Sequence, residues 1–267
     1  MKKKIMVLLV CTSMLLLALS GCSSGGSSTS TVSSEPLTIE EISDLYQNPD
    51  AYKGRTVEVG GRIFNVDGSA FQFWHDPMNN QGNTIVDTSE ATVSGINRDA
   101  YVIVRGTVQG AYEGTNSYGG TIGAVMIKAT DVQPSDYQTV VAPAIKTVEV
   151  NQTIDQYGCV LSLEKVEFSD YDTRFYLTAT NNSSNNLSLY SFNAKAVQNG
   201  TQYQPDSANS YYASYPEFSG DILPGVTQNA IIAFPKMNQS SLQLVLEAYS
   251  SDYTLNMDPY MFDVTIQ

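Results

Sequence analysis

Few side chains in this sequence of 267 residues could carry out nucleophilic or metal chemistry. It contains one histidine, His75, and three cysteines, at positions 11, 22 and 159. A Ser-His-Asp triad would have to use His75, yet no Gly-x-Ser-x-Gly motif follows residue 21 to present the serine. Zinc needs several His or Cys ligands, and His75 and Cys159 are the only ones beyond residue 22. We therefore expect no enzyme activity, metal or cofactor, with a hydrolase as the weaker alternative.

Cys22 stands in a different context from the other cysteines. Three lysines at positions 2–4 precede an apolar run over residues 5–19. That run is shorter than the ~20 residues that a helix needs to span a bilayer, and its proportions are those of an export signal. Leu19-Ser20-Gly21 stand directly before Cys22, and together they resemble a bacterial lipobox. A plain secretion signal with an incidental cysteine is the alternative.

The lipobox resemblance implies that residues 1–21 are a lipoprotein signal peptide and that the Cys22 thiol carries a diacylglyceryl group, with fatty acids such as palmitate. Each buried CH₂ contributes ~0.8 kcal/mol of membrane affinity, and two acyl chains anchor stably where one is marginal. The expected location is therefore the extracellular face of the cell membrane, with the lipid bilayer as the first partner.

Residues 22–36 are rich in Ser, Gly and Thr. This composition buries too little apolar area to offset the entropy of ordering, and it predicts a flexible tether. Over the whole chain, 27 acidic side chains outnumber 14 basic ones, for a formal net charge of −13. Nucleic-acid binding depends on Lys and Arg that release counterions from phosphates, so a nucleic-acid partner is not expected.

Beyond the tether, residues 37–46 have helical spacing with Thr38 as N-cap. Gly60-Gly61 indicates a bulge or bend in the strand that follows, and Asp67-Gly68 indicates a tight hairpin. Five strands in about eighty residues favour a small closed barrel. The expected strands are 57–66, 70–75, 84–87, 101–108 and 121–129.

Two stretches within residues 37–137 resemble the anticodon-binding-type OB-fold domain found in many bacterial lipoproteins. They are YKGRTVEVGG, from Tyr52 to Gly61, and VRGTV, from Val104 to Val108. The resemblance implies an OB-like five-stranded barrel with an N-terminal helix. Such barrels bind oligonucleotides or oligosaccharides on strands 2 and 3 and the flanking loops.

Residues 141–267 contain seven or more short, alternating strands with turn signals between them, which predicts a β-sandwich. Three stretches, 157–166, 174–182 and 192–200, followed by Leu223-Pro224-Gly225, resemble an immunoglobulin-like domain of unknown function found in secreted lipoproteins of Gram-positive bacteria. That family implies no catalytic residues. Cys159 lies within one of the apolar strand patterns, where a buried structural thiol is expected.

Two groups of residues are candidates for a ligand-binding surface. Strand alternation places Phe71 and Phe73 inside the barrel and Trp74 on its outer face, as a stacking platform or as a cap over the core; His75 follows it. The second group, in what the sequence predicts to be a long polar loop, is Tyr211, Tyr212 and Tyr215. Tyrosines give contact area at low entropy cost, but they could equally lie flat on the sandwich.

These patterns favour a membrane-anchored extracellular lipoprotein that binds a protein or an envelope glycan without catalysis. The alternative is a structural or envelope-stress accessory protein that takes no small ligand.

Overall fold

The computed structural model describes residues 35–91, 93, 96–115 and 119–266, which belong to one compact unit. The predicted signal peptide, the lipobox residues Leu19, Ser20 and Gly21, the lipidation site Cys22 and all but the last two residues of the tether lie outside these residues. No helix in the described ranges is long and apolar enough to cross a membrane.

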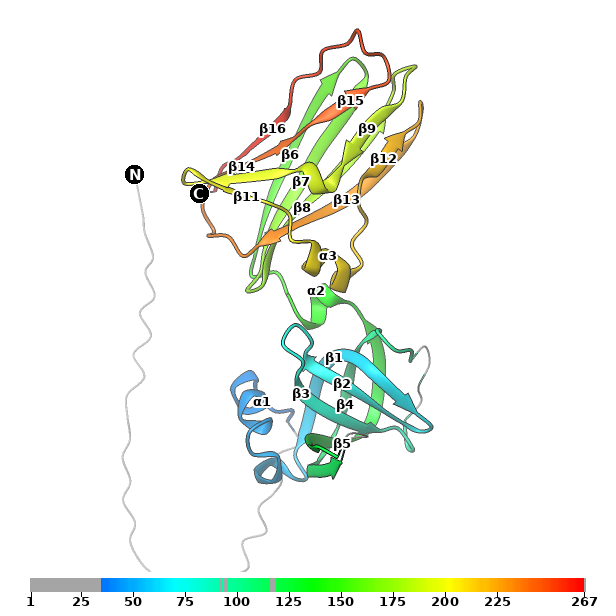
Figure 1. The fold of residues 1–267 in the computed structure, drawn as a ribbon. Helices are drawn as coiled ribbons and strands as arrows, with labels where there is room; N and C mark the ends of the chain where they lie inside the picture. Colours follow the sequence, from blue (N-terminus) through cyan, green and yellow to red (C-terminus); the bar gives the residue numbers. More distant parts are fainter. Residues whose placement is uncertain (1–34, 92, 94–95, 116–118, 267) are drawn as a thin grey trace, which may run out of the picture. The chain divides into compact units, whose positions relative to one another are not determined.

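The first part of the chain folds into a closed five-stranded barrel, which confirms the predicted OB-like fold (Figure 1). Around the barrel the strands follow the order β1-β2-β3-β5-β4, and β4 closes onto β1. Among the described strands of the barrel, β3 and β5 pair in parallel and the other pairs are antiparallel. The strands are β1 (Thr56–Asp67), β2 (Ala70–Asp76), β3 (Gln81–Asp87), β4 (Tyr101–Thr115) and β5 (Thr121–Ser135).

A short helix precedes the barrel, α1 (Ile39–Leu45), with the 3-10 turn η1 (Pro49–Tyr52) after it. The predicted N-cap is confirmed, because the Thr38 hydroxyl accepts from the backbone of Glu41 and the Glu41 side chain accepts from the backbone of Thr38. This reciprocal capping box satisfies two of the helix's unpaired amides. Leu45 is fully buried in the barrel core and joins the helix to it.

Strand alternation fills the barrel interior as the sequence predicts. Phe71 and Phe73 are 2% and 0% exposed, with ring centroids 6.3 Å apart. Trp74, the residue after Phe73, faces outward and is half-buried. The hairpin at Asp67-Gly68 is also confirmed, since Asp67 pairs with Ala70.

Of the bulge or bend expected at Gly60-Gly61, the bulge is not found at these two residues. The register of β1 against β2 shifts later, between Ile63 and Asn65. Gly61 instead permits close packing of the two strands: a Cβ at this position would lie 2.0 Å from Cδ2 of Phe73 and 2.5 Å from the carbonyl oxygen of Trp74. Glycine suits both a strand bulge and a close approach of two strands, and the sequence alone does not distinguish these two roles.

Gly61→Ala is expected to lower the free energy of unfolding by about 1–3 kcal/mol, the range for overpacking a filled core. The matched control is Gly123→Ala in β5, where an added Cβ meets no atom within 4 Å and the change should stay within about 0.5 kcal/mol. Urea unfolding followed by fluorescence of the single tryptophan, Trp74, measures both. Equal stability of the two variants would contradict this packing argument.

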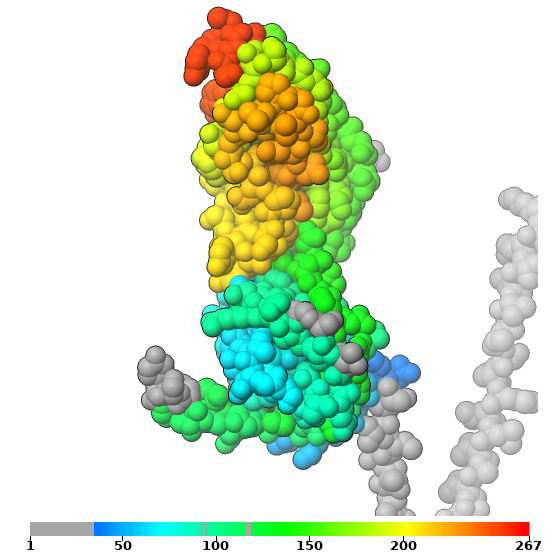
Figure 2. Space-filling view, turned by 90° about the vertical axis from the view of Figure 1, so that its right-hand side faces the viewer, coloured from blue at the N-terminus to red at the C-terminus, as the bar shows by residue number. Residues whose placement is uncertain are grey.

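The ends of β4 and β5 extend beyond the barrel as a two-stranded arm, residues 110–115 and 121–124. β4 pairs with β1 only as far as Thr107, and β5 pairs with β3 only from Val125 onward, so these ends pair only with each other. A register shift between Val108 and Gly110 marks the start of the arm. Asp50 holds the start of the arm in place, because its carboxylate accepts a hydrogen bond from the Ala111 amide at 2.9 Å. Figure 2 shows the described part of the arm in green beside the cyan barrel strands.

The rest of the chain is a sandwich of antiparallel sheets, as predicted. The sheet orders are β13-β8-β7-β6, β11-β10-β14-β16 and β12-β9-β15. Their strands are β6 (Lys146–Gln156), β7 (Cys159–Phe168), β8 (Asp172–Asn181), β9 (Leu187–Tyr190), β10 (Lys195–Gln198), β11 (Thr201–Tyr203), β12 (Ser219–Ile222), β13 (Thr227–Pro235), β14 (Leu242–Leu246), β15 (Ala248–Ser250) and β16 (Tyr260–Val264). Cys159 is 1% exposed within the core, which confirms the predicted buried thiol, and burial raises its pKa.

Three short helical segments accompany these sheets. α2 (Tyr137–Val140) follows the last barrel strand, and η2 (Ser191–Asn193) follows β9. α3 (Ser207–Ala213) occupies the stretch that the sequence predicts as a polar loop, and that prediction is wrong. Asp206 caps α3 by accepting hydrogen bonds from the Ala208 and Asn209 amides, which offsets the lack of an apolar face.

A buried arginine contacts two carboxylates and a tyrosine within the sandwich. Arg174 on β8 is 0% exposed, and its Nη1 donates to the Ala142 carbonyl at 2.8 Å and to the Tyr215 hydroxyl at 3.4 Å. Its Nη2 lies 3.1 Å from Oε2 of Glu167, and Nη1 lies 3.5 Å from Oδ1 of Asp172, which is also 0% exposed. These contacts tie β7 and β8 to the segment after α2.

Candidate binding groove

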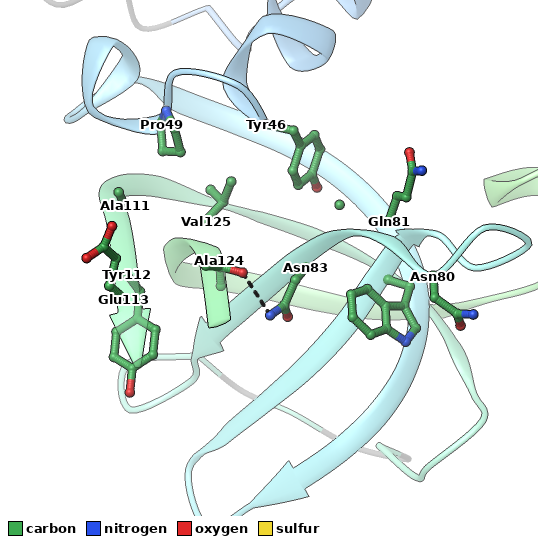
Figure 3. Close-up of a pocket in the computed structure, with 13 residues that line it drawn as sticks. Tyr46, Pro49, Asn80, Gln81, Asn83, Ala111, Tyr112, Glu113, Ala124 and Val125 are labelled. Atoms are coloured by element: carbon green, nitrogen blue, oxygen red, sulfur yellow. Dashed lines mark hydrogen bonds between the residues drawn. The ribbon is translucent and has the colours of Figure 1, made fainter. Parts of the chain in front are cut away.

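Two clefts, of about 460 and 560 Å³, lie between α1, the start of β3 and the arm, and they share Tyr46, Gln81 and Gly82. We call the two clefts together the barrel groove. The first cleft is lined also by Trp74, Asn80, Asn83, Tyr112 and Glu113, and the second by Ile39, Ile42, His75 and Asp76. Figure 3 shows how Tyr46, Asn83 and the arm residues surround the first cleft.

Trp74 lies in the first cleft with one side of its indole ring covered. The ring stacks on Phe64, with centroids 4.4 Å apart and an angle of 19°. Phe64 stands at the register shift of β1, so the bulge places this second ring beside Trp74. The structure thus gives a half-buried, supported indole at the groove wall, a geometry suited to stacking against a flat ligand face.

His75 follows on β2 and lines the second cleft. Its Nδ1 lies 2.9 Å from the Gly60 carbonyl oxygen, and because a carbonyl only accepts, Nδ1 carries the proton. In the neutral ring, Nε2 is then the acceptor. The imidazole stacks on Tyr46, with centroids 5.0 Å apart at 15°. Gly82 allows β3 to approach, since it has φ +70° and a Cβ there would lie 2.7 Å from Cβ of His75.

Tyr46 forms the ridge between the two clefts and is held rigidly. Its hydroxyl is hydrogen-bonded to the Thr84 hydroxyl at 3.0 Å, and Thr84 is 0% exposed. Burial raises the pKa of Tyr46 well above its ordinary value, although the bond to Thr84 opposes this. The phenol is therefore neutral over the whole physiological range and offers its ring, not a charge, to the groove.

In the first cleft, three side-chain amides supply the polar lining. No hydrogen bond of the Asn80 or Gln81 side chain to another described residue is found. Asn83 donates to the Gly123 carbonyl at 3.1 Å across the parallel β3–β5 pairing (Figure 3). Its Oδ1 atom is buried and has no partner in the described part of the chain. The groove thus offers donors and acceptors that the fold itself leaves unused.

The arm adds a further aromatic ring, Tyr112, which is 37% exposed. A Cβ at Gly114 would lie 2.8 Å from Cε1 of Tyr112, so the ring rests against the arm backbone at this glycine. The charged groups that line the groove are the carboxylates of Glu113 and Asp76; among the described lining residues there is neither Lys nor Arg.

The structure brings two of the predicted surface residues together and separates the others from them. Trp74 and His75 line the groove, whereas the three tyrosines line neither cleft. Tyr211 is 74% exposed on α3, and the ring of Tyr212 lies 5.1 Å from the Arg62 guanidinium. Tyr215 is buried and accepts a hydrogen bond from Arg174, so it presents no open loop surface.

Within the ranges that the structure describes, no group of three or more His, Cys, Asp or Glu side chains gathers as a metal site would require. No known protein-family model matches the chain, and no curated protein matches it in sequence.

Proposed function

We propose that this chain is an exported lipoprotein, anchored through Cys22 in the cell membrane, that binds a protein or an envelope glycan on the extracellular side without transforming it. The observation that carries the proposal is the barrel groove. There, a supported indole, a rigid phenol and unused amide groups line two clefts that share Tyr46. Binding sites commonly combine aromatic walls with a few orienting polar groups.

The finer family resemblances support the same proposal. The strand order and the parallel β3–β5 pair agree with the anticodon-binding-type OB-fold domain, and OB-folds use this side of the barrel and the β4–β5 connection for ligands. The sandwich agrees with the immunoglobulin-like domain of Gram-positive lipoproteins. Since one fold hosts many functions, the argument depends on the groove residues and not on the fold.

Trp74→Ala is expected to weaken ligand binding by at least about tenfold, because truncating a central aromatic anchor costs ~2 kcal/mol and 1.4 kcal/mol is a factor of ten. The full-length chain in detergent micelles would be screened on arrays of envelope proteins and glycans, and the hits titrated by calorimetry. Tyr211→Ala, which removes an exposed tyrosine from α3, is the control and should leave the affinity unchanged.

If the chain is instead a structural or envelope-stress accessory protein, we expect no saturable binding that depends on Trp74. Equal affinities of the wild type and Trp74→Ala, or a loss confined to Tyr211→Ala, would count against the groove as the binding site.

A further inference from the structure

We propose that the ligand of the barrel groove is an uncharged glycan chain whose sugars carry acetamido groups. This inference rests on the proposed function and goes further by naming the chemistry of the ligand. Three properties of the groove support this inference: its aromatic faces, its unpaired amides and the sign of its charges.

The aromatic side chains are arranged to receive the apolar faces of sugar rings. Phe64 covers one side of the Trp74 indole at 4.4 Å, and Tyr112 rests against the arm at Gly114. Rings supported from behind lose little conformational entropy when a ligand stacks on them. A sugar ring presents C–H groups on one face and hydroxyls around its rim, which matches such a wall with polar groups beside it.

The amides specify the acetamido group. A side-chain amide has one acceptor oxygen and two N–H donors, which is the complement of the N–H and C=O of an acetamido group. Asn80 and Gln81 have both functions unused within the described chain. Both side chains are exposed, so each can accept from the N–H and donate to the C=O of an acetamido group, an amide pair that a hydroxyl-only sugar does not carry.

The charges exclude acidic polymers. The ionisable carboxylates in the groove belong to Asp76 and Glu113, and the Asp76 carboxylate already accepts from the backbone and side-chain amides of Asn79 at 3.2 and 2.8 Å. An incoming phosphate or uronate would meet like charges without a cation among the described lining residues. Like-charge contacts of this kind disfavour a partner by several kcal/mol. A neutral chain meets no such cost.

The groove is long enough for more than one sugar. Its two clefts have volumes of about 460 and 560 Å³, each within the range of ~300–1,000 Å³ of small-molecule sites. They adjoin at Tyr46 and Gln81, so a chain that fills both crosses the rigid phenol of Tyr46. On the second cleft, Nε2 of His75 can accept from a ligand hydroxyl.

The single tryptophan of the chain lies in the groove and makes a direct test possible. The full-length protein in detergent micelles would be titrated with three probes: chitotetraose, which carries acetamido groups, cellotetraose, which lacks them, and tetragalacturonate, which is anionic. Chitotetraose is expected to change the Trp74 emission saturably, with an affinity at least about tenfold above that of cellotetraose, and tetragalacturonate is expected to cause no change.

A matched pair of variants assigns the preference to the amides. Gln81→Ala should weaken chitotetraose binding about 5- to 10-fold, the effect of losing one or two hydrogen bonds, while Gln202→Ala, an exposed glutamine on β11, should leave it unchanged. Equal affinity for cellotetraose, or binding of tetragalacturonate, overturns the inference but leaves a glycan-binding groove standing.

Two further outcomes separate this inference from the proposed function. If none of the three probes binds but a protein partner does, and Trp74→Ala abolishes that binding, the glycan inference is wrong and the proposed function holds. If no ligand of either class depends on Trp74, both are wrong.

Discussion

Arg174→Met should lower the free energy of unfolding by about 3–5 kcal/mol, since removing one partner from a buried ion pair leaves the other charge uncompensated. Arg174 and Asp172 are both 0% exposed, and Glu167 lies 3.1 Å from the guanidinium. Methionine keeps much of the side-chain volume, so the loss reports the charges and hydrogen bonds and not a cavity. Urea unfolding followed by far-ultraviolet circular dichroism measures it.

The control for Arg174 is Lys236→Met, which removes a cation from an exposed pair with Asp170 at 2.7 Å. Exposed pairs contribute ~0–1 kcal/mol, so this variant should unfold like the wild type. A loss below 1 kcal/mol for Arg174→Met would contradict the buried ionic cluster as a stabilising centre of the sandwich.

The same variant should show a characteristic pH dependence. Burial holds the pKa of Asp172 above its ordinary value even beside Arg174, and loss of the guanidinium removes an attraction that opposed this shift. A carboxyl whose folded-state pKa is raised contributes stability that is present below the unfolded pKa and is lost as pH rises through the folded pKa. The deficit of Arg174→Met relative to the wild type should therefore be smaller at pH 4 than at pH 7.

Cys22→Ser should abolish lipid anchoring, because serine lacks the thiol that would carry the diacylglyceryl group. Two acyl chains, at ~0.8 kcal/mol per buried CH₂, account for the whole predicted membrane affinity. The variant should appear in the culture medium or accumulate as an unprocessed precursor. Cell fractionation and mass spectrometry of the intact protein distinguish these fates.

Cys159→Ala is the control for the lipidation experiment, since its thiol is buried in the sandwich core and should have no part in anchoring. A Cys22→Ser protein that stays in the membrane fraction at its processed size would show that the lipobox assignment is wrong.

Local patterns were sufficient to predict the five barrel strands and the hairpin, but not the strand ends. β4 runs to Thr115 and β5 to Ser135, beyond the expected ends at 108 and 129. The alternation around Phe71 and Phe73 predicts the barrel interior, and Asp67-Gly68 predicts the β1–β2 turn, because side-chain period and turn chemistry are properties of adjacent residues. Helix α3 was not predictable in this way. Its seven residues have no apolar repeat. Capping by Asp206 and the packing of Tyr212 and Ala213 against a buried cluster stabilise it.

The groove depends on contacts that no local pattern encodes. Asn83 meets Gly123 through the parallel pairing of β3 with β5, and Tyr46 reaches the same place from α1. The sequence singled out Trp74 and His75 by residue type and by strand alternation. It missed Tyr46, Asn83 and Tyr112, because their shared position follows from barrel closure and from the register of the arm.

Amide hydrogen exchange of the full-length protein, with and without a solubilised digest of bacterial cell-wall glycan, tests the central claim most directly. The account predicts slower exchange in residues 74–83 and 111–113 when ligand is present, and no change in α3. Protection confined to residues 207–215, or none at all in the barrel at saturating ligand, would contradict the barrel groove as the binding site.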